Sequence, residues 1–251
     1  MKIALIGYGK MGREVEQAAR KRGHVIAARI DPISDLGGAS EISSQTIGSA
    51  DVCVEFTRPE AAVTNIKQVV RLQKPLVVGT TGWYQHLPAI EKIVLQEKTG
   101  FVYAPNFSLG VNLFYRVAAA AARLFHRFEE YDVCGVETHH RFKADSPSGT
   151  ARKLSEIVLE HFPRKKRIVV DSLNRAIEPE EFHLVSLRAG NFPGTHSLAF
   201  DSAADTVELT HTARSRAGFA SGALLAAEWI VGRQGVYTFE QVLQDLLGGA
   251  E

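Results

Sequence analysis

The sequence predicts an α/β protein in two parts, a doubly wound parallel sheet and a second α+β domain with a mixed open sheet. Over the first 104 residues, five short apolar segments alternate with helical segments, which is typical of parallel strands joined by crossover helices. A glycine-rich turn separates the first strand from the first helix. In the second half, strand-like segments follow one another without obvious crossover helices, which indicates strands of mixed direction.

The glycine-rich turn has the context of a dinucleotide site. The strand Lys2–Ile6 runs into Gly7-Tyr8-Gly9-Lys10-Met11-Gly12, a helical pattern follows, and the next strand, Val25–Ile30, ends at Asp31. In a Rossmann-like fold, Gly7 permits the tight turn, Gly9 lets a pyrophosphate approach the backbone, and Gly12 allows close packing of helix on strand. The Asp31 carboxylate would then hold the ribose hydroxyls.

The choice between NADH and NADPH depends on the residues around Asp31. A 2′-phosphate needs a cation beside this carboxylate, but the next residue is Pro32. Arg29 lies two positions earlier on the strand and could point toward the same edge. We therefore expect NADH or NADPH as the cofactor and favour NADH.

The rest of the first sheet supplies a second ligand-binding segment. Further strands are expected at Asp51–Phe56, Leu76–Val78 and Phe101–Ala104. Gly79-Thr80-Thr81-Gly82 follows the middle one, at the carboxyl end of a strand, where open α/β sheets bind ligands. Thr57 is expected to cap the helix that follows it, and the polar segment Ser34–Ser49 is expected to be a surface loop with little regular structure.

The pattern changes at Pro105-Asn106-Phe107-Ser108, before a long helix from Leu109 to about Phe128. Four strand-like segments follow at Arg167–Val170, Phe182–Arg188, Thr195–Phe200 and Thr206–Thr212. We expect the last three to be antiparallel neighbours, with another subunit on the open face of their sheet. The C-terminal helices, Phe219–Val231 and Phe239–Leu247, should cover the first sheet.

These boundaries predict a dinucleotide-binding domain of residues 1–108 and 217–251, and a substrate-binding and oligomerisation domain of residues 109–216. We expect the two domains to hinge at the segments that join them, 105–109 and 214–217.

Composition excludes several classes of protein. The net charge of +1 over 251 residues gives no electrostatic reason to expect nucleic-acid or membrane binding. No apolar run approaches the ~20 residues of a membrane span, and the N-terminus resembles no signal peptide. Cys53 and Cys134 both lie in apolar runs, so we expect buried free thiols and a cytoplasmic protein.

The stretch Glu137–Ala151 carries most of the chemistry. It follows a strand expected at Tyr131–Val136 and contains His139, His140, Arg141, Lys143 and Asp145. Ser148-Gly149-Thr150 lies where a helix should begin, and the first backbone N–H groups of a helix bind anions such as carboxylates. The sequence therefore predicts a reaction centre here.

No metal site is expected. His139 and His140 are adjacent and would point to opposite faces of an extended chain, and no cysteine or acidic residue has ligand spacing to them. We interpret His183, His196 and His211 in the second sheet as hydrogen-bonded structural histidines.

The motif His139-His-Arg-Phe-Lys143-Ala-Asp145-Ser-Pro147-Ser-Gly-Thr150-Ala resembles the signature of the 4-hydroxy-tetrahydrodipicolinate reductase family of lysine biosynthesis. The resemblance extends over nearly the whole chain, in the order of the family, through motifs at residues 7–12, 55–57, 79–82, 106–112 and 211–216. It implies reduction of 4-hydroxy-tetrahydrodipicolinate by NAD(P)H, with loss of water, in the diaminopimelate pathway. It also implies a homotetramer assembled through the second sheet.

The resemblance also implies a role for each matching residue. His139 corresponds to the catalytic acid/base and Lys143 to the proton donor, and the substrate is a small cyclic imine with two carboxylates. Substrate binding falls to His140 and the helix start at Ser148, Gly149 and Thr150. The cofactor site comprises Gly7 to Gly12, Asp31, Gly79, Thr80, Thr81, Ala104, Pro105, Asn106, Phe107 and Arg216. The order in which His139 and Lys143 deliver the proton stays open.

Two other functions remain compatible with the sequence. One is an NAD-dependent dehydrogenase of the same two-domain plan that acts on another substrate, such as an amino acid or a sugar. The other is a protein that binds NADH without catalysis. The second gives no reason for Lys143 to lie four residues after His139.

Overall fold

The computed structural model of the chain describes residues 1–33, 36, 38–170 and 172–248. Its contacts divide the chain into two compact units, Met1–Leu109 with Arg216–Glu251, and Gly110–Ser215. Among the described residues, no helix is both long enough and apolar enough to cross a membrane.

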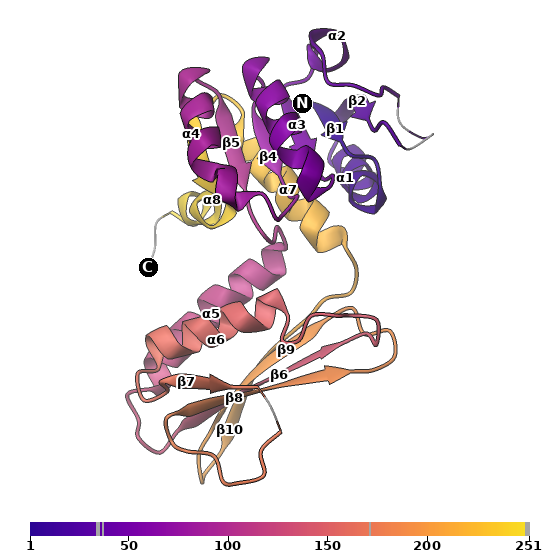
Figure 1. Cartoon of the computed structure of the whole chain (residues 1–251). Coiled ribbons are helices and arrows are strands. Elements are labelled where there is room, and N and C mark those ends of the chain that lie inside the picture. Colours follow the sequence, from indigo (N-terminus) through magenta and orange to yellow (C-terminus); the bar gives the residue numbers. More distant parts are fainter. Residues whose placement is uncertain (34–35, 37, 171, 249–251) are drawn as a thin grey trace. The chain divides into compact units, whose positions relative to one another are not determined.

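A six-stranded, wholly parallel sheet forms the first unit (Figure 1). Its strand order is β11 (Gly235–Thr238), β5 (Gly100–Tyr103), β4 (Leu76–Val78), β3 (Val52–Glu55), β1 (Lys2–Ile6) and β2 (Val25–Ile30). The doubly wound parallel sheet predicted from the sequence is confirmed. The edge strand β11 was not predicted, because only four half-buried residues form it and their pairing with β5 joins distant parts of the chain.

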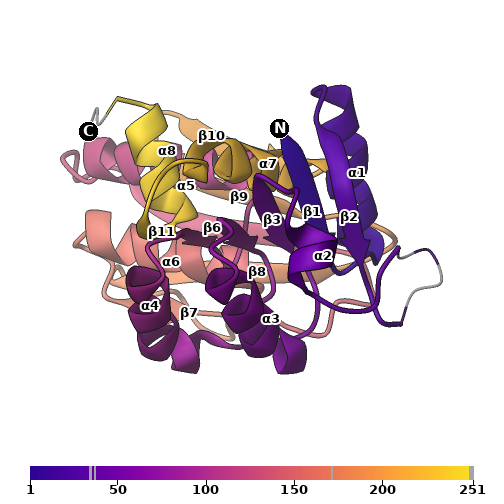
Figure 2. The same cartoon turned by 90° about the horizontal axis from the view of Figure 1, so that it is seen from above.

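Helices cover both faces of this sheet (Figure 2). One face carries α1 (Lys10–Lys21), α7 (Ala217–Ile230) and α8 (Phe239–Leu246), so the prediction that C-terminal helices cover the first sheet is confirmed. The other face carries α2 (Ser44–Ile47), α3 (Pro59–Arg71), a 3-10 turn η1 (Tyr84–His86) and α4 (Leu87–Gln96).

The segment 34–49, expected to have little regular structure, contains one short helix, α2, where Ser43 and Thr46 form a reciprocal capping box. Residues 34, 35 and 37 of this segment lie outside the described residues. A single capped turn is too short to show helical periodicity in the sequence. The N-cap of α3 is Arg58 rather than Thr57, because the Thr57 hydroxyl donates a hydrogen bond to the carboxylate of Glu55.

A five-stranded mixed sheet forms the second unit, in the order β10 (Thr206–Thr212), β9 (Thr195–Asp201), β6 (Asp132–His139), β8 (Glu181–Arg188) and β7 (Arg167–Val169). The predicted mixed sheet is confirmed, but β8 is not a neighbour of β9. Instead β6 lies between them, antiparallel to β9 and parallel to β8. The parallel pair is possible because helix α6 (Gly149–His161) lies in the connection between β6 and β8.

One face of the mixed sheet packs against α6 and α5 (Leu109–Phe125), which ends three residues before the expected position (Figure 1). Phe182, Leu184, Leu198 and Phe200 form the centre of this core. The opposite face stays exposed in the single chain, and Val136 and Leu187 on it are 39% and 51% exposed. Cys134 lies in the same alternating series as Val136 and is exposed, so the expectation of two buried thiols holds only for Cys53.

Strand β6 is longer than predicted and includes His139 as its last residue. Its burial alternates, with Val133, Gly135, Glu137 and His139 all buried. Because alternate residues of a strand share a face, Glu137 and His139 lie side by side on the face that the helices cover.

Candidate active site

The glycine turn after β1 is built for close packing. Gly7 has φ +87°, and a Cβ on Gly7 would collide with the backbone oxygen of Phe56. A Cβ on Gly12 would collide with the backbone oxygen of Gly7. A Cβ on Gly9, in contrast, would have no neighbour within 4 Å. Gly9 therefore borders open space at the start of α1, where no side chain caps the first backbone N–H groups. An open helix N-terminus of this kind can bind a pyrophosphate through its backbone N–H groups.

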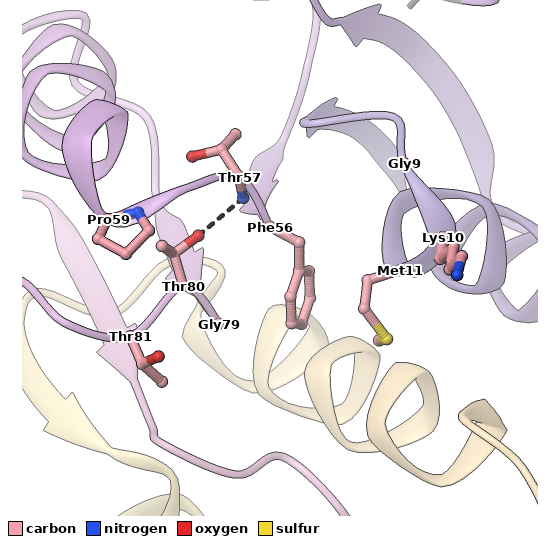
Figure 3. A pocket seen from close by; sticks show the side chains of 9 residues that line it. All are labelled: Gly9, Lys10, Met11, Phe56, Thr57, Pro59, Gly79, Thr80 and Thr81. Carbon is pink, nitrogen blue, oxygen red and sulfur yellow. Dashed lines mark hydrogen bonds between the residues drawn. The ribbon is translucent and has the colours of Figure 1, made fainter. Parts of the chain in front are cut away.

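A pocket of about 350 Å³ opens beside this turn (Figure 3). It brings together two segments predicted from the sequence, Gly9-Lys10-Met11 and Gly79-Thr80-Thr81. Three further lining residues were not predicted as site residues, namely Phe56, Thr57 and Pro59. These three residues could have been predicted from the sequence, because they follow strand β3. This strand lies between β1 and β4 in the sheet, and ligands bind at the carboxyl ends of such strands.

A partly buried hydrogen-bond network links Thr57 and Thr80 at one wall of the pocket. The backbone N–H of Thr57 donates to Thr80 Oγ1 at 2.7 Å (Figure 3), and the Thr57 hydroxyl donates to Glu55. Asn65 Nδ2 lies 3.3 Å from both Glu55 Oε1 and Thr57 Oγ1. Burial raises the pKa of the Glu55 carboxyl, against hydrogen bonds from Thr57, Thr80 and Asn65.

Asp31 and Arg29 lie at the end of β2 in different roles. The Asp31 carboxylate accepts hydrogen bonds from the backbone N–H of Tyr8 at 2.8 Å and of Ile33 at 2.9 Å. Arg29 is held by Glu16 of α1, with Nε and Nη2 at 2.7 and 2.6 Å from the two carboxylate oxygens. The hydroxyl of Tyr8 also donates to Glu16, at 2.6 Å. The hydrogen bond from Arg29, more than those from Tyr8 and Arg20, lowers the pKa of Glu16 to about 2 against the effect of burial.

The remaining predicted cofactor residues do not line this pocket. Ala104 and Phe107 are buried, and the Phe107 ring packs on Phe56 and Phe239 at centroid distances of 6.3 and 5.0 Å. Pro105 is exposed between them. The side chain of Asn106 accepts the backbone N–H of Ser108 at 2.8 Å. Arg216 is exposed and forms the N-cap of α7.

In the second unit, His139 is buried at the end of β6. Its Nδ1 lies 3.3 Å from Glu137 Oε2, and its ring centroid lies 5.0 Å from that of His196. Burial lowers the pKa of His139 to about 4; the Glu137 charge opposes this, while His196, Lys143 and Arg188 add to it. Without substrate, His139 is therefore neutral at pH 7.

Glu137 is fully buried and has five polar neighbours. Its Oε1 accepts hydrogen bonds from the Ser148 backbone N–H at 3.0 Å, from Ser186 Oγ at 2.7 Å and from Arg188 Nη2 at 2.9 Å. His139 and His196 face Oε2. None of Glu137, Ser186, Arg188 and His196 was predicted as a site residue. Glu137 had a visible signal, because it lies two positions before His139, but the other three come from distant strands.

The expectation that no acidic residue has ligand spacing to His139 is wrong. Glu137, His139 and His196 each offer a ligand atom, and these atoms lie within 4.8 Å of one another. Because Arg188 already pairs with the Glu137 carboxylate at 2.9 Å, we interpret this group as a hydrogen-bonded array around His139. The structure also moves His196 from a separate structural role into contact with the predicted reaction centre.

Lys143 follows in the turn after β6, and its Nζ lies 2.8 Å from Asp145 Oδ1. Its side chain is 23% exposed, against 9% for that of His139. His140 is half-buried, and its ring centroid lies 6.3 Å from that of Phe142. Arg141 is exposed, with its guanidinium over the Phe142 ring at 5.0 Å. The turn thus presents cations toward solvent while His139 stays buried.

Helix α6 begins at Gly149 with Ser148 as N-cap, so the predicted helix start is confirmed. Ser148 is buried, and its Oγ accepts the Ala151 N–H at 3.2 Å and lies 3.2 Å from His196 Nε2. Gly149 is exposed, and a Cβ there would have no neighbour within 4 Å. The first backbone N–H groups of a helix have no acceptor within it, so those of Gly149 and Thr150 can bind an anion.

Two family models match the chain. The model for the N-terminus of dihydrodipicolinate reductase matches residues 1–107, and the model for the C-terminus matches residues 110–243. A 4-hydroxy-tetrahydrodipicolinate reductase from Christiangramia forsetii is 38% identical over 246 residues, which cover 98% of this chain and 99% of that protein.

Solved structures show the same fold. A dipicolinate-bound dihydrodipicolinate reductase from Paenisporosarcina sp. TG-14 aligns with a TM-score of 0.75 and 23% identity, over 96% of this chain and 98% of its own. A scyllo-inositol dehydrogenase from Lactobacillus casei aligns with a TM-score of 0.58 and 12% identity, over 97% and 92% of the two chains. At these identities the likeness concerns the fold alone.

Proposed function

This chain belongs to the dihydrodipicolinate reductase family, and from this premise we propose how its residues reduce 4-hydroxy-tetrahydrodipicolinate. The enzyme is an NAD(P)H-dependent oxidoreductase of the diaminopimelate and lysine pathway, and it forms tetrahydrodipicolinate with loss of water. Bound NAD(P)H supplies the hydride. The chain itself must hold a dicarboxylate and deliver a proton to the ring.

One observation carries this proposal. A single strand–turn–helix segment, from β6 to α6, places the buried His139, the cation Lys143 and an open helix N-terminus within twelve residues. The backbone N–H groups of Gly149 and Thr150 bind one substrate carboxylate. Lys143 and Arg141 favour the negative charge of the substrate, and His140 contributes a further contact to it. Ser148 is buried, and its hydroxyl oxygen accepts the backbone N–H of Ala151 in the first turn of the helix.

Proton delivery is divided between His139 and Lys143. A histidine with a pKa of about 4 is neutral at pH 7, so in the free enzyme His139 can accept a proton but holds none to give as a cation. We assign the donation to the ring to Lys143. His139 takes up a proton from solvent once substrate is bound and then passes it to Lys143, which restores the donor. The substrate's two carboxylates favour the protonated form of His139, so its pKa rises when they bind.

The cofactor site comprises the turn from Gly7 to Gly12, the segment Gly79-Thr80-Thr81 and the Asp31 carboxylate. The open space at Gly9 accommodates the pyrophosphate, and Asp31 holds the adenosine ribose. Ala104, Pro105, Asn106, Phe107 and Arg216 complete the nicotinamide end, with Phe107 supporting the pocket through Phe56.

We infer a preference for NADH. Asp31 repels a 2′-phosphate, and the nearest strand cation, Arg29, is held by two short hydrogen bonds to Glu16. Replacing Glu16 with alanine should release Arg29 and raise the ratio of kcat/KM for NADPH to that for NADH about tenfold, the effect of ~1.4 kcal/mol. Initial rates with both cofactors measure this ratio.

Two controls accompany that measurement. Arg20→Ala removes another partner of Glu16 (Nε–Oε1 2.8 Å) but leaves the Arg29 pair, so the ratio should stay at the wild-type value. A Glu16→Ala/Arg29→Ala double variant should lose the gain. A wild-type enzyme that already prefers NADPH would contradict the assignment of Arg29.

We propose that the enzyme is a cytoplasmic homotetramer whose contacts cover the open face of the mixed sheet. Leu187→Glu should shift the mass measured by light scattering toward smaller species, because a buried charge is costly. Leu124→Glu, at an exposed position on α5, is the control and should leave the mass unchanged. A monomeric wild-type protein would refute the tetramer.

Turnover of freshly generated 4-hydroxy-tetrahydrodipicolinate tests the proposed function. Oxidation of NADH or NADPH should depend on this substrate. Oxidation with an amino acid or sugar substrate instead, or with no substrate at all, would refute it.

A further inference from the structure

Glu137 is a buried carboxylate that the reaction as described does not use, although it touches both parts of the proposed substrate site. We propose that Glu137 is a positioning residue, which fixes the tautomer of His139 with one oxygen and the start of helix α6 with the other. The proposal rests on the proposed role of His139, and its first test is independent of turnover.

The two side chains are neighbours because of strand geometry. Glu137 and His139 are alternate residues of β6 and lie on the same buried face. His139 Nδ1 lies 3.3 Å from Glu137 Oε2, and the same oxygen lies 3.4 Å from His196 Nε2. Neither His139 Nδ1 nor Glu137 Oε2 completes a well-aligned hydrogen bond in this conformation, and both atoms are buried. Glu137 Oε2 therefore lies within reach of both imidazole rings, and His139 Nδ1 is slightly the nearer.

Glu137 is ionised in this position. Burial raises its pKa, but the close contact with His196 and the hydrogen bonds from Ser148, Ser186 and Arg188 outweigh burial and hold the pKa well below its usual range. An ionised carboxylate can only accept hydrogen bonds. It therefore favours the His139 tautomer that carries the hydrogen on Nδ1, and this tautomer leaves the lone pair on Nε2.

Gly194 keeps the Nε2 side of the ring clear. A Cβ at residue 194 would lie 2.9 Å from His139 Nε2, and the backbone there has φ +140°, a conformation that disfavours side chains. Glu137 thus lies beside Nδ1, and Gly194 lies beside Nε2. One holds the hydrogen on Nδ1, and the other leaves the accepting nitrogen without a side chain against it.

The other carboxylate oxygen serves the helix. Glu137 Oε1 accepts the backbone N–H of Ser148, the N-cap of α6, at 3.0 Å. The Ser148 hydroxyl in turn accepts the N–H of Ala151 and contacts His196. Glu137 thus fixes the position of the N–H groups at Gly149 and Thr150 relative to His139.

The charges around His139 predict how its titration responds. Glu137 is the group that raises the pKa of His139, whereas Lys143, Arg188 and His196 lower it. Neutralising Glu137 leaves the charges of Lys143 and Arg188 unopposed, so the pKa of His139 should fall further.

Solid-state NMR of protein labelled with ¹⁵N-histidine, without substrate, tests the tautomer. The chain has nine histidines, and a His139→Gln sample identifies the His139 signal by its absence. Wild-type protein at pH 7 should show His139 with the hydrogen on Nδ1. If the hydrogen lies on Nε2 of His139 in the wild-type protein, the proposed role of Glu137 is wrong. The proposed function of the enzyme is not affected by that result.

The Glu137→Gln variant tests the same point through kinetics. Its kcat should fall ~10-fold or more. General acid–base groups raise the rate ~10²–10⁴-fold, and part of this rate gain is lost when His139 is in the wrong tautomer. The pH profile should also change, while the dissociation constant for NADH should not.

Glu181→Gln is the matched control. Glu181 is a buried carboxylate of the same sheet, paired with Arg167 and Arg175 rather than with a histidine. It should leave the tautomer and the pH profile unchanged even if it lowers thermal stability. Equal effects of the two variants, or a Glu137→Gln enzyme with the wild-type kcat and pH profile, would overturn the positioning role.

Discussion

Replacing Lys143 with methionine is expected to lower kcat by ~10²–10⁴-fold, the contribution of one well-placed proton-transfer group. Methionine keeps most of the length and apolar character of the side chain but can neither donate a proton nor pair with Asp145. His139→Gln should give a loss in the same range, because glutamine hydrogen-bonds without exchanging a proton. Initial-rate kinetics with saturating NADH measures both losses.

The control for these variants is Lys153→Met. Lys153 is an exposed lysine of helix α6 whose Nζ lies 3.7 Å from a carboxylate oxygen of Glu156, so its removal should leave kcat unchanged. The dissociation constant for NADH should also be unchanged in all three variants, because the nucleotide pocket belongs to the other compact unit. Wild-type kcat in both Lys143→Met and His139→Gln would remove this segment from the chemistry.

A second large effect is expected at the glycine turn, where two alanine substitutions should behave differently. Gly9→Ala should leave stability near the wild-type value, because a Cβ there meets no protein atom within 4 Å. The same Cβ would occupy the space assigned to the pyrophosphate, so NADH affinity should fall at least ~10-fold, or ~1.4 kcal/mol.

Gly12→Ala should instead lower both stability and NADH affinity. Its Cβ would collide with the backbone oxygen of Gly7, and overpacking of this kind costs ~1–3 kcal/mol. Thermal unfolding and NADH titration, performed on both variants, separate the two cases. Wild-type NADH affinity in Gly9→Ala would place the pyrophosphate elsewhere.

The sequence predicted the first sheet better than the second. Parallel strands joined by helices repeat a local pattern, and each apolar strand is visible by itself. In the mixed sheet, by contrast, β6 lies between β8 and β9, and the choice of neighbours depends on long-range pairing that no local pattern records. The exposure of Cys134 could not be predicted for the same reason, since an apolar run does not show which of its faces is covered.

The residues of the candidate site likewise fall into two groups, those that are close in the sequence and those that only the folded sheet brings together. His139, Lys143 and the helix start at Gly149 lie in one continuous segment, so the sequence was sufficient to propose them together. His196, Ser186 and Arg188 reach Glu137 from β9 and β8, and only the folded sheet brings them there. The pKa of His139 is likewise a property of burial, which the sequence alone does not record.

If this chain reduces the ring of 4-hydroxy-tetrahydrodipicolinate with hydride from a nicotinamide, the hydride can be followed by an isotope. The experiment is a single turnover with NADH deuterated at the transferring position, run in ordinary water with freshly generated substrate. Mass spectrometry of the tetrahydrodipicolinate formed should show one deuterium per molecule, with one NADH oxidised for each product. Product without deuterium, or no NADH oxidised in the presence of this substrate, would contradict the claim.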